Sequence, residues 1–136
     1  MKLYLSDVTR KFVEDFSQSL PHAVLLTGSV GVGLGALAKH LTDSNGTLLV
    51  SVAPEVKRTG SLAAISIERI RELYTETRSR QNTPSFVIID DADAMTTAAQ
   101  NSLLKLLEEP NESIHFILTS HSPDRLLPTI LSLIHI

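Results

Sequence analysis

Short apolar runs alternate along the chain with segments whose apolar residues recur at helical spacing. A continuous apolar run bounded by turn residues is typical of a strand that is covered on both faces. By this criterion we expect four strands, at 23–27, 47–52, 86–89 and 115–119. Strands that alternate with amphipathic helices predict an α/β fold with a largely parallel sheet.

The segments with helical spacing predict four helices and one short turn. The first helix is expected to begin near Ser6 or Asp7, and Ser66 is expected to cap the third. Residues 43–46 (DSNG) have the composition of a turn, and residues 54–64, which mix Pro, Gly, Ser and basic residues, are predicted to form a loop. The other predicted helical segments are 36–41, 98–107 and a single turn over 122–127.

The amino-acid composition and net charge exclude several classes of protein. The 136 residues fit one domain, and 43% hydrophobic residues suffice to bury a core. A formal net charge of −3 argues against a free-standing nucleic-acid binder, though not against a subunit that touches DNA within an assembly. The chain has no cysteine and its histidines lack metal-ligand spacing, so we expect no metal site. No apolar run reaches the roughly 18 residues that cross a bilayer, so we expect a cytoplasmic protein without membrane contact.

A glycine cluster, GSVGVGLG at 28–35, follows the first predicted strand. Glycines in that position let backbone N–H groups and the N-terminus of the next helix face a phosphate. A working loop reads G-x-x-x-x-G-K-[ST], whereas here Leu34 stands at the lysine and Gly35 at the hydroxyl that binds Mg²⁺. We therefore interpret the set as a vestigial nucleotide-binding turn, with weak nucleotide binding through the backbone and ATP hydrolysis as alternatives. Its members are Gly28, Gly31, Gly33, Leu34 and Gly35.

Asp90 and Asp91 directly follow the third predicted strand, in the arrangement of a Walker B motif. Carboxylates at the carboxyl end of a buried parallel strand lie where α/β folds bind their ligands. In such a site the first carboxylate orients a metal and the next activates water. Alternatively, the two residues end a strand and cap the next helix. Without the lysine and the hydroxyl, Asp90 has no metal to hold unless a ligand comes from elsewhere.

From Ile89 onward the exact residues are more informative about the protein family than the spacing of the apolar positions. The segments are IDDADAM, AAQNSLLKLLEEP, FILTS and LLPTI. These segments resemble the AAA+ clamp-loader family that includes the delta-prime and gamma/tau subunits of bacterial DNA polymerase III. ISIERIREL at 65–73 is similar as well, and the resemblance covers residues 10–130. It implies a P-loop NTPase-like core, with helices on both faces of a parallel sheet. It also implies that Thr119 or Ser120 occupies the position that senses the γ-phosphate.

The resemblance implies a subunit of a ring-like complex that opens the sliding clamp and places it on primed DNA. The degenerate loop favours the delta-prime type, which can lack a working nucleotide site, over the gamma/tau type, which keeps the lysine. We therefore expect a non-hydrolysing subunit without a bound cofactor, ATP with Mg²⁺ being the alternative. Its expected partners are gamma/tau, delta, the clamp and, through the complex, primed DNA. An active gamma/tau-type ATPase with an atypical loop and a structural relic without loader partners are the other hypotheses.

The C-terminal segment departs from the family pattern. After T-I-x-S the family continues with an arginine that reaches the ATP of a neighbouring subunit, whereas Ser132 is followed by Leu133. The string LSLIHI also matches one reading frame of a common sequencing adaptor. We therefore predict a truncated AAA+ core at 1–130 and a non-native, adaptor-derived tail at 131–136.

Overall fold

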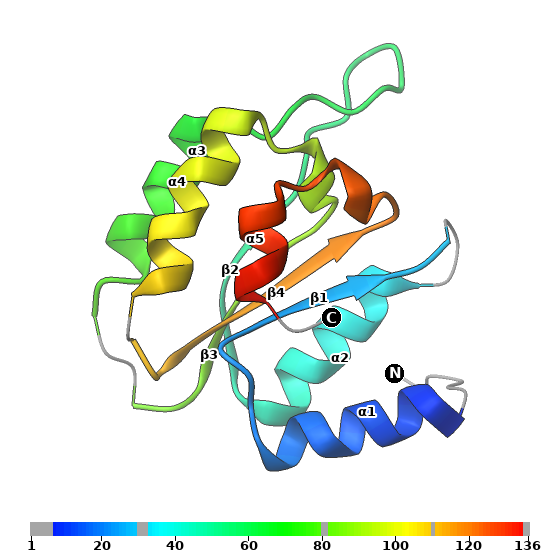
Figure 1. The fold of residues 1–136 in the computed structure, drawn as a ribbon, viewed down its shortest axis with the longest axis vertical. Helices are drawn as coiled ribbons and strands as arrows, with labels where there is room; N and C mark the ends of the chain where they lie inside the picture. Colours follow the sequence, from blue (N-terminus) through cyan, green and yellow to red (C-terminus); the bar gives the residue numbers. More distant parts are fainter. Residues whose placement is uncertain (1–6, 30–32, 80–81, 110, 135–136) are drawn as a thin grey trace.

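Four parallel strands form the centre of the fold: β1 (Ala23–Thr27), β2 (Thr47–Val52), β3 (Ser85–Ile89) and β4 (Ile114–Ser120). The computed structural model of the chain describes residues 7–29, 33–79, 82–109 and 111–134. The strands lie in the order β1-β4-β3-β2 (Figure 1). Because every neighbouring pair is parallel, the carboxyl ends of all four strands meet at one edge of the sheet.

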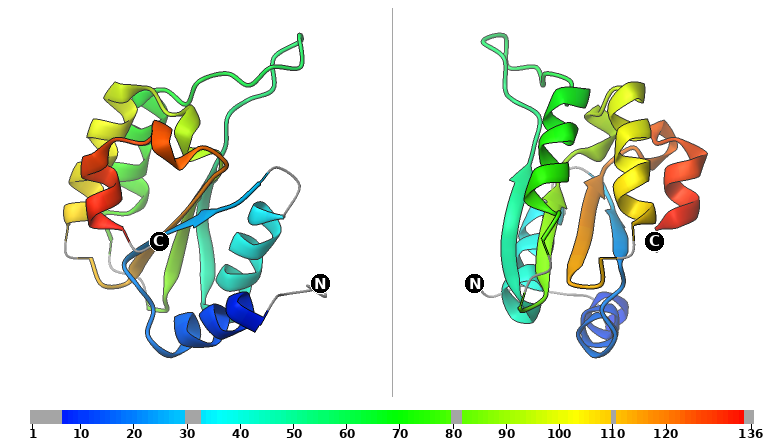
Figure 2. Two further views of the ribbon diagram at one scale, coloured as in Figure 1. Left: turned by 45° about the vertical axis from the view of Figure 1, so that its right-hand side comes forward. Right: turned by 90° about the vertical axis from the view of Figure 1, so that its left-hand side faces the viewer.

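Helices cover both faces of this sheet (Figures 1 and 2). One face packs against α1 (Asp7–Gln18) and α2 (Leu34–Asn45). The opposite face packs against α3 (Ile67–Glu76), α4 (Thr97–Glu108) and α5 (Pro128–Leu133). Two short 3₁₀ turns, η1 (Ala92–Ala94) and η2 (Pro123–Arg125), follow β3 and β4. The predicted three-layer α/β architecture is confirmed.

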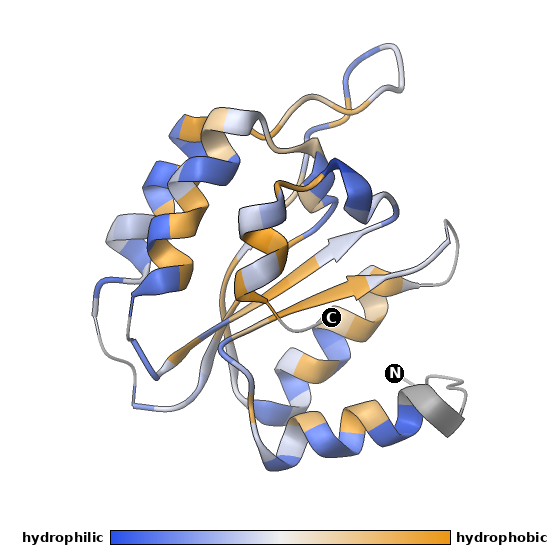
Figure 3. Ribbon diagram, in the orientation of Figure 1, coloured by the Kyte–Doolittle hydropathy of each residue, from blue (hydrophilic) through white to orange (hydrophobic). Residues whose placement is uncertain are grey.

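Alternating side chains of the central strands supply two separate cores. In β3, Phe86 and Ile88 belong to the cluster on the α1–α2 side, whereas Val87 and Ile89 belong to the cluster on the α3–α5 side. All four side chains are buried. A strand that is covered on both faces needs a continuous apolar run, and FVII is such a run. In Figure 3, β1 is likewise mainly apolar, while α1 and α4 mix apolar with hydrophilic residues.

The predicted strand boundaries agree closely with the structure. β1 and β2 match the predicted ranges residue for residue. β3 begins one residue earlier than predicted, and β4 extends one residue further at each end. No helix within the described ranges is long and apolar enough to cross a membrane.

The predicted turn at 43–46 is wrong, because residues 43–45 form the last turn of α2. Asn45 Nδ2 donates to Leu41 O at 2.7 Å, and the Gly46 N–H donates to Thr42 O at 2.9 Å. The polar residues therefore close the helix instead of following it. A Cβ on Gly46 would lie 2.0 Å from the Pro84 carbonyl oxygen, so the chain passes here only with glycine.

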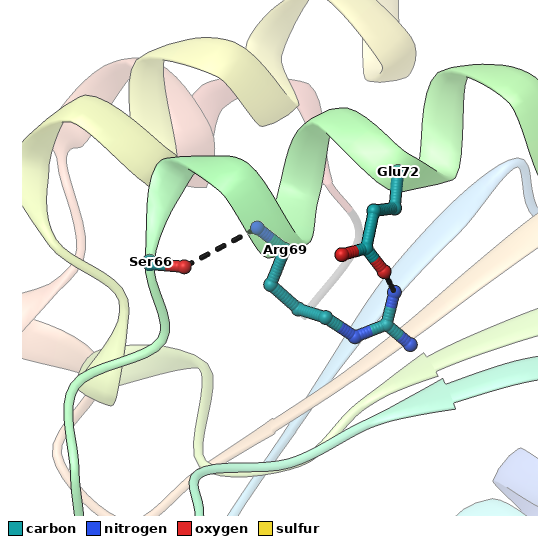
Figure 4. Close-up of polar contacts among 3 residues, drawn as sticks. All are labelled: Ser66, Arg69 and Glu72. Atoms are coloured by element: carbon teal, nitrogen blue, oxygen red, sulfur yellow. Dashed lines mark hydrogen bonds and ion pairs between the residues drawn. The ribbon is translucent and has the colours of Figure 1, made fainter.

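Two helices on the α3–α5 face begin at side-chain caps. Ser66 Oγ accepts a hydrogen bond from the Arg69 N–H at 3.2 Å, which confirms the predicted cap of α3 (Figure 4). The Arg69 guanidinium also pairs with Glu72 at 2.9 Å one turn further along. Thr96 Oγ1 caps α4 in the same way, by accepting from the Ala99 N–H at 3.1 Å. Each cap satisfies one N–H group that the first helical turn leaves open.

Residues 53–64, called the arm below, project from the body between β2 and α3 (Figures 1 and 2). The predicted loop at 54–64 is confirmed, apart from one isolated antiparallel bridge between Val56 and Leu62. Hydrogen bonds close the arm at Lys57 N to Ser61 O, 2.8 Å, and at Ala63 N to Glu55 O, 2.7 Å.

The C-terminal segment packs against the cluster on the α3–α5 side. The helical turn predicted at 122–127 is present in shorter form as η2, whereas α5 was not predicted. Ile130 and Ile134 are buried in that cluster. The predicted boundary after residue 130 falls inside α5, and residues 135–136 lie outside the described residues. The non-native origin of 131–136 stays a prediction.

Candidate functional site

The predicted site residues converge on the carboxyl edge of the sheet. Asp90 and Asp91 follow β3, Thr119 and Ser120 end β4, and the glycine loop follows β1. β1 and β4 are neighbours in the sheet, as are β3 and β4, so β4 lies between the loop and the two carboxylates. The site therefore joins segments about 30 and 60 residues apart in sequence, as expected for a parallel sheet.

The glycine loop enters α2 through an unusual backbone conformation. Gly33 has φ +78° and precedes α2 as its N-cap, without a side-chain hydrogen bond to the helix. Glycine adopts this left-handed conformation without the penalty that a Cβ brings. Gly28 begins the loop after β1, while Gly31 lies outside the described residues.

Leu34 and Gly35 occupy the first turn of α2, where Leu34 is buried and Gly35 is exposed. Leu34 is 8% exposed and packs in the core with α1 and α2, so its side chain contributes burial and no charge. Gly35 is exposed, and a Cβ built on it would lie 3.8 Å from Asp90 Oδ1. The backbone thus places position 35 beside the first carboxylate, but this chain has no hydroxyl there.

Thr119 holds Asp90 and Asp91 together. Its Oγ1 donates to Asp90 Oδ1 at 3.1 Å and accepts from the Asp91 N–H at 3.1 Å. The Thr119 hydroxyl therefore acts both as a donor and as an acceptor. The residue is 3% exposed. Burial raises the pKa of Asp90, and the nearby Asp91 charge adds to the rise, while the Thr119 hydrogen bond opposes it. No lysine or arginine pairs with Asp90 in the described part of the chain.

Asp91 takes the left-handed conformation, with φ +49° and ψ +53°. Aspartate tolerates this region better than most residues with a side chain. The conformation turns the chain from β3 into η1, where the Ala94 N–H donates to Asp91 O at 2.8 Å. The structure thus supports part of the alternative interpretation, because Asp91 ends the strand and precedes a short helical turn.

Ser120 is engaged with a carboxylate that the sequence did not single out. Its Oγ donates to Asp93 Oδ1 at 2.7 Å and accepts from the Ser122 N–H at 3.0 Å. Ser120 is fully buried. Asp93 lies two residues after Asp91 in the sequence, but only the structure shows that its hydrogen-bond partner is Ser120 on β4.

His121 links the end of β4 to the glycine loop. Its Nδ1 lies 2.8 Å from the Gly28 carbonyl oxygen, and the side chain is exposed. The sequence contains no signal for this contact, since the two residues come from separate segments.

The side chains at the sheet edge lack two groups that a working nucleotide-binding loop contains. The lysine and hydroxyl positions hold Leu34 and Gly35. Among the described residues, no group of three or more His, Asp or Glu side chains could hold a metal ion. The start of α2, which Gly33 precedes, is a helix N-terminus, a kind of position that binds anions.

The sequence matches known DNA polymerase III subunits. Residues 5–136 match the family described as DNA polymerase III, delta subunit. The chain is 32% identical to DNA polymerase III subunit delta' of Pseudomonas aeruginosa over 133 residues, which covers 82% of this chain and 40% of that protein. It is 31% identical to subunit gamma/tau of Mycobacterium bovis over 140 residues, covering 84% of this chain and 23% of that protein. The chain therefore spans less than half the length of these relatives.

Solved structures agree on the fold. A gamma subunit-related protein of Thermotoga maritima superposes with a TM-score of 0.65 at 23% identity, covering 94% of this chain and 44% of that one. The RuvB Holliday junction branch migration motor of Thermotoga maritima gives a TM-score of 0.71 at 13% identity, covering 96% and 43%. The AAA domain of FIGL-1 gives 0.63 at 16% identity, covering 94% and 50%. The predicted P-loop NTPase-like AAA+ fold is confirmed.

Proposed function

The chain belongs to the DNA polymerase III delta-subunit family of clamp-loader proteins, and from this premise we propose that it acts as a delta-prime-type subunit that does not hydrolyse ATP. Its task is then to hold a fixed position in the loader while other subunits bind and hydrolyse the nucleotide. Its partners are the gamma/tau and delta subunits, and through them the sliding clamp and primed DNA.

The absence of the lysine and the hydroxyl from the glycine loop carries this proposal. In a working site the carboxylate after β3 orients a metal. Here the buried Thr119 hydroxyl donates to one oxygen of that carboxylate, Asp90 Oδ1. Leu34 and Gly35 remove the lysine and the hydroxyl from the same site. The missing lysine and hydroxyl therefore weaken the case for an active nucleotide site.

Position 133 offers no cation to a neighbouring subunit, since Leu133 stands where the family resemblance places arginine. Leu133 is 42% exposed at the end of α5. Because residues 131–136 are predicted to be non-native, the positional role that we propose rests on the residues of the glycine loop and not on Leu133.

Calorimetric titration with ATP, with and without Mg²⁺, tests the proposal. We expect no saturable binding up to about 1 mM ATP, where the binding free energy is only about −4 kcal/mol. The variant Leu34→Lys/Gly35→Ser restores both missing groups, and we expect it to bind more tightly than the parent chain. The single variant Gly35→Ser is the matched control, because it restores the hydroxyl without the charge.

The second candidate is an active ATPase of the gamma/tau type with an atypical loop. The match to the gamma/tau subunit of Mycobacterium bovis, at 31% identity, favours it. Mg²⁺-dependent binding of ATP that Asp90→Asn abolishes would support this candidate and contradict the proposal. Binding of equal strength with and without Mg²⁺ would indicate contact through the loop backbone alone.

Membership of a loader is tested separately by co-purification with gamma/tau-type and delta-type subunits. We expect a complex that survives size-exclusion chromatography. If the chain elutes alone in the presence of both partners, the loader role fails, and the interpretation as a structural relic takes its place.

A further inference from the structure

The arm exposes two apolar side chains on one surface. Val56 is 71% and Leu62 is 48% exposed, which makes them the two most exposed large apolar side chains in the described part of the chain. The antiparallel bridge places them directly opposite each other. Directly opposite residues of an antiparallel pair lie on the same face. The arm thus carries a small apolar surface that is open to solvent.

The arm is held in shape and has a basic tip. The Gly60 N–H donates to Lys57 O at 2.9 Å, and Gly60 has φ +85°, so the tip is a closed turn. Thr59 and Ser61 add a hydrogen bond of 2.8 Å between their hydroxyl groups. Lys57 and the adjacent Arg58 are exposed, and neither has an ion-pair partner among the residues described.

A hollow of complementary character lies at the opposite edge of the sheet. Its volume is about 410 Å³, and Leu20 and Leu107 supply its apolar part. Its rim carries three exposed carboxylates that lack an ion-pair partner in the described ranges, Glu108, Glu109 and Glu112. His22 also lines it, and His22 Nε2 is buried without a hydrogen-bond partner. The hollow therefore combines the half-buried apolar side chain of Leu20 with the negative charge of its rim.

We propose that the arm of one molecule docks into this hollow of a second copy. Val56 and Leu62 pack against the half-buried Leu20, and the basic tip of the arm faces the carboxylates of the rim. One molecule cannot make the contact with itself, because the arm leaves the carboxyl end of β2 whereas the hollow lies at the amino ends of β1 and β4.

A nucleic acid fits the arm less well than a protein surface. Binding a phosphate backbone draws its affinity from several cations, and the arm offers Lys57 and Arg58 beside an acidic Glu55. The hollow at the base of the arm is lined by Glu68, Arg69 and Glu72, and Arg69 is already paired with Glu72. Apolar side chains flanked by charge are typical of a protein contact with an apolar centre and a polar rim.

The proposed contact joins two different surfaces and is therefore head-to-tail. Such contacts close into rings or continue as open chains, depending on the rotation between neighbours. An arm of 12 residues buries less than the ~1,200 Å² of a standard interface. We therefore expect weak association that depends on protein concentration and weakens as salt screens the charges. The contact is independent of the function proposed above.

Sedimentation velocity of the 136-residue chain over a concentration series tests the contact. We expect reversible self-association that Lys57→Glu/Arg58→Glu weakens at least tenfold, and that Val56→Ser/Leu62→Ser also weakens. The matched control is Arg10→Glu/Lys11→Glu, which makes the same charge change on exposed residues of α1. Thermal melting by circular dichroism verifies that each variant is folded.

Charge exchange decides between a specific contact and general attraction. Glu108→Lys/Glu112→Lys should weaken self-association as the arm variant does, since each variant then opposes like charges. In a mixture of the two variants the altered arm meets the altered rim with opposite charges, so association should return. Loss in each variant with recovery in the mixture supports the proposal.

Three results would overturn it: no association at about 1 mM chain, the range of very weak contacts; undiminished association of the arm variant; or no recovery in the mixture. If the parent chain stays monomeric and binds a short DNA duplex that the arm variant does not bind, the arm serves nucleic acid instead.

Discussion

The two halves of the sheet edge use their polar groups in different ways. On the glycine-loop side, Gly33 caps α2 without a side chain and Gly35 offers no atom to the space beside Asp90. On the β3–β4 side, Thr119 and Ser120 each donate one hydrogen bond and accept another. The hydroxyl groups on the β3–β4 side therefore find their partners within the chain.

The difference shows that this edge of the sheet keeps the placement of the site residues but lacks some of the chemical groups of a working nucleotide-binding loop. The fold still brings residue 35 to within van der Waals distance of Asp90. The groups that would act on a phosphate are missing on one side and already bonded on the other. Substitutions that break the β3–β4 contacts should therefore cost stability, whereas substitutions in the glycine loop should cost little unless the backbone conformation forbids them.

Thr119→Val should have the largest effect. The substitution keeps the side-chain volume but leaves the Asp91 N–H and Asp90 Oδ1 without their partner. An unsatisfied group costs about 1–3 kcal/mol, so we expect a loss of about 2–4 kcal/mol in the free energy of unfolding. Chemical denaturation measures it. Thr119→Ser keeps the hydroxyl and should recover most of the loss, and equal losses in both variants would mean that the methyl group matters instead.

Ser120→Ala comes next, with an expected loss of about 1–3 kcal/mol. The change removes the donor to Asp93 and the acceptor of the Ser122 N–H, but Asp93 is only half-buried and water can replace part of the contact. The matched control is Ser51→Ala, at an exposed position of β2, which should change stability by less than about 0.5 kcal/mol. A loss at Ser120 no larger than at Ser51 would show that the Asp93 contact contributes nothing.

The sequence predicted where the site residues lie along the strands better than it predicted their hydrogen bonds. The apolar runs located the strands, so Asp90 was placed at the end of the third strand, and the family resemblance singled out Thr119 or Ser120 at the end of the fourth. Their hydrogen bond was not predicted, because it depends on the pairing of β3 with β4 at atomic detail. The turn at 43–46 failed for a related reason, since polar residues that end a helix have the same composition as those that follow one.

Asp90→Asn should change the pH dependence of stability. Folding raises the pKa of Asp90 through burial, so its contribution is greatest at low pH, where the group is protonated in both states. The contribution falls as the pH rises from the unfolded pKa of about 3.9 through the folded pKa. Asparagine stays neutral and still accepts from Thr119, so the variant should be more stable than the parent at pH 7.

The gain at pH 7 should be about 1.4 kcal/mol for each pKa unit by which folding raises the Asp90 value, and it should vanish near pH 3. Denaturation curves at a series of pH values measure it. A gain of the same size at pH 3 would show that the amide improves packing and that titration of Asp90 is not the cause.

Gly35→Ser should have the smallest effect and gives the sharpest test of the comparison. Position 35 is exposed and helical, and its Cβ would meet Asp90 Oδ1 at an ordinary 3.8 Å, so we expect a change of less than about 0.5 kcal/mol. Gly33→Ser is the matched control in the same loop. Nothing lies within 4 Å of its Cβ, but φ +78° penalises any side chain, and we expect a loss of about 1–2 kcal/mol. If the two variants lose equal stability, the loop is limited by space and not by backbone conformation.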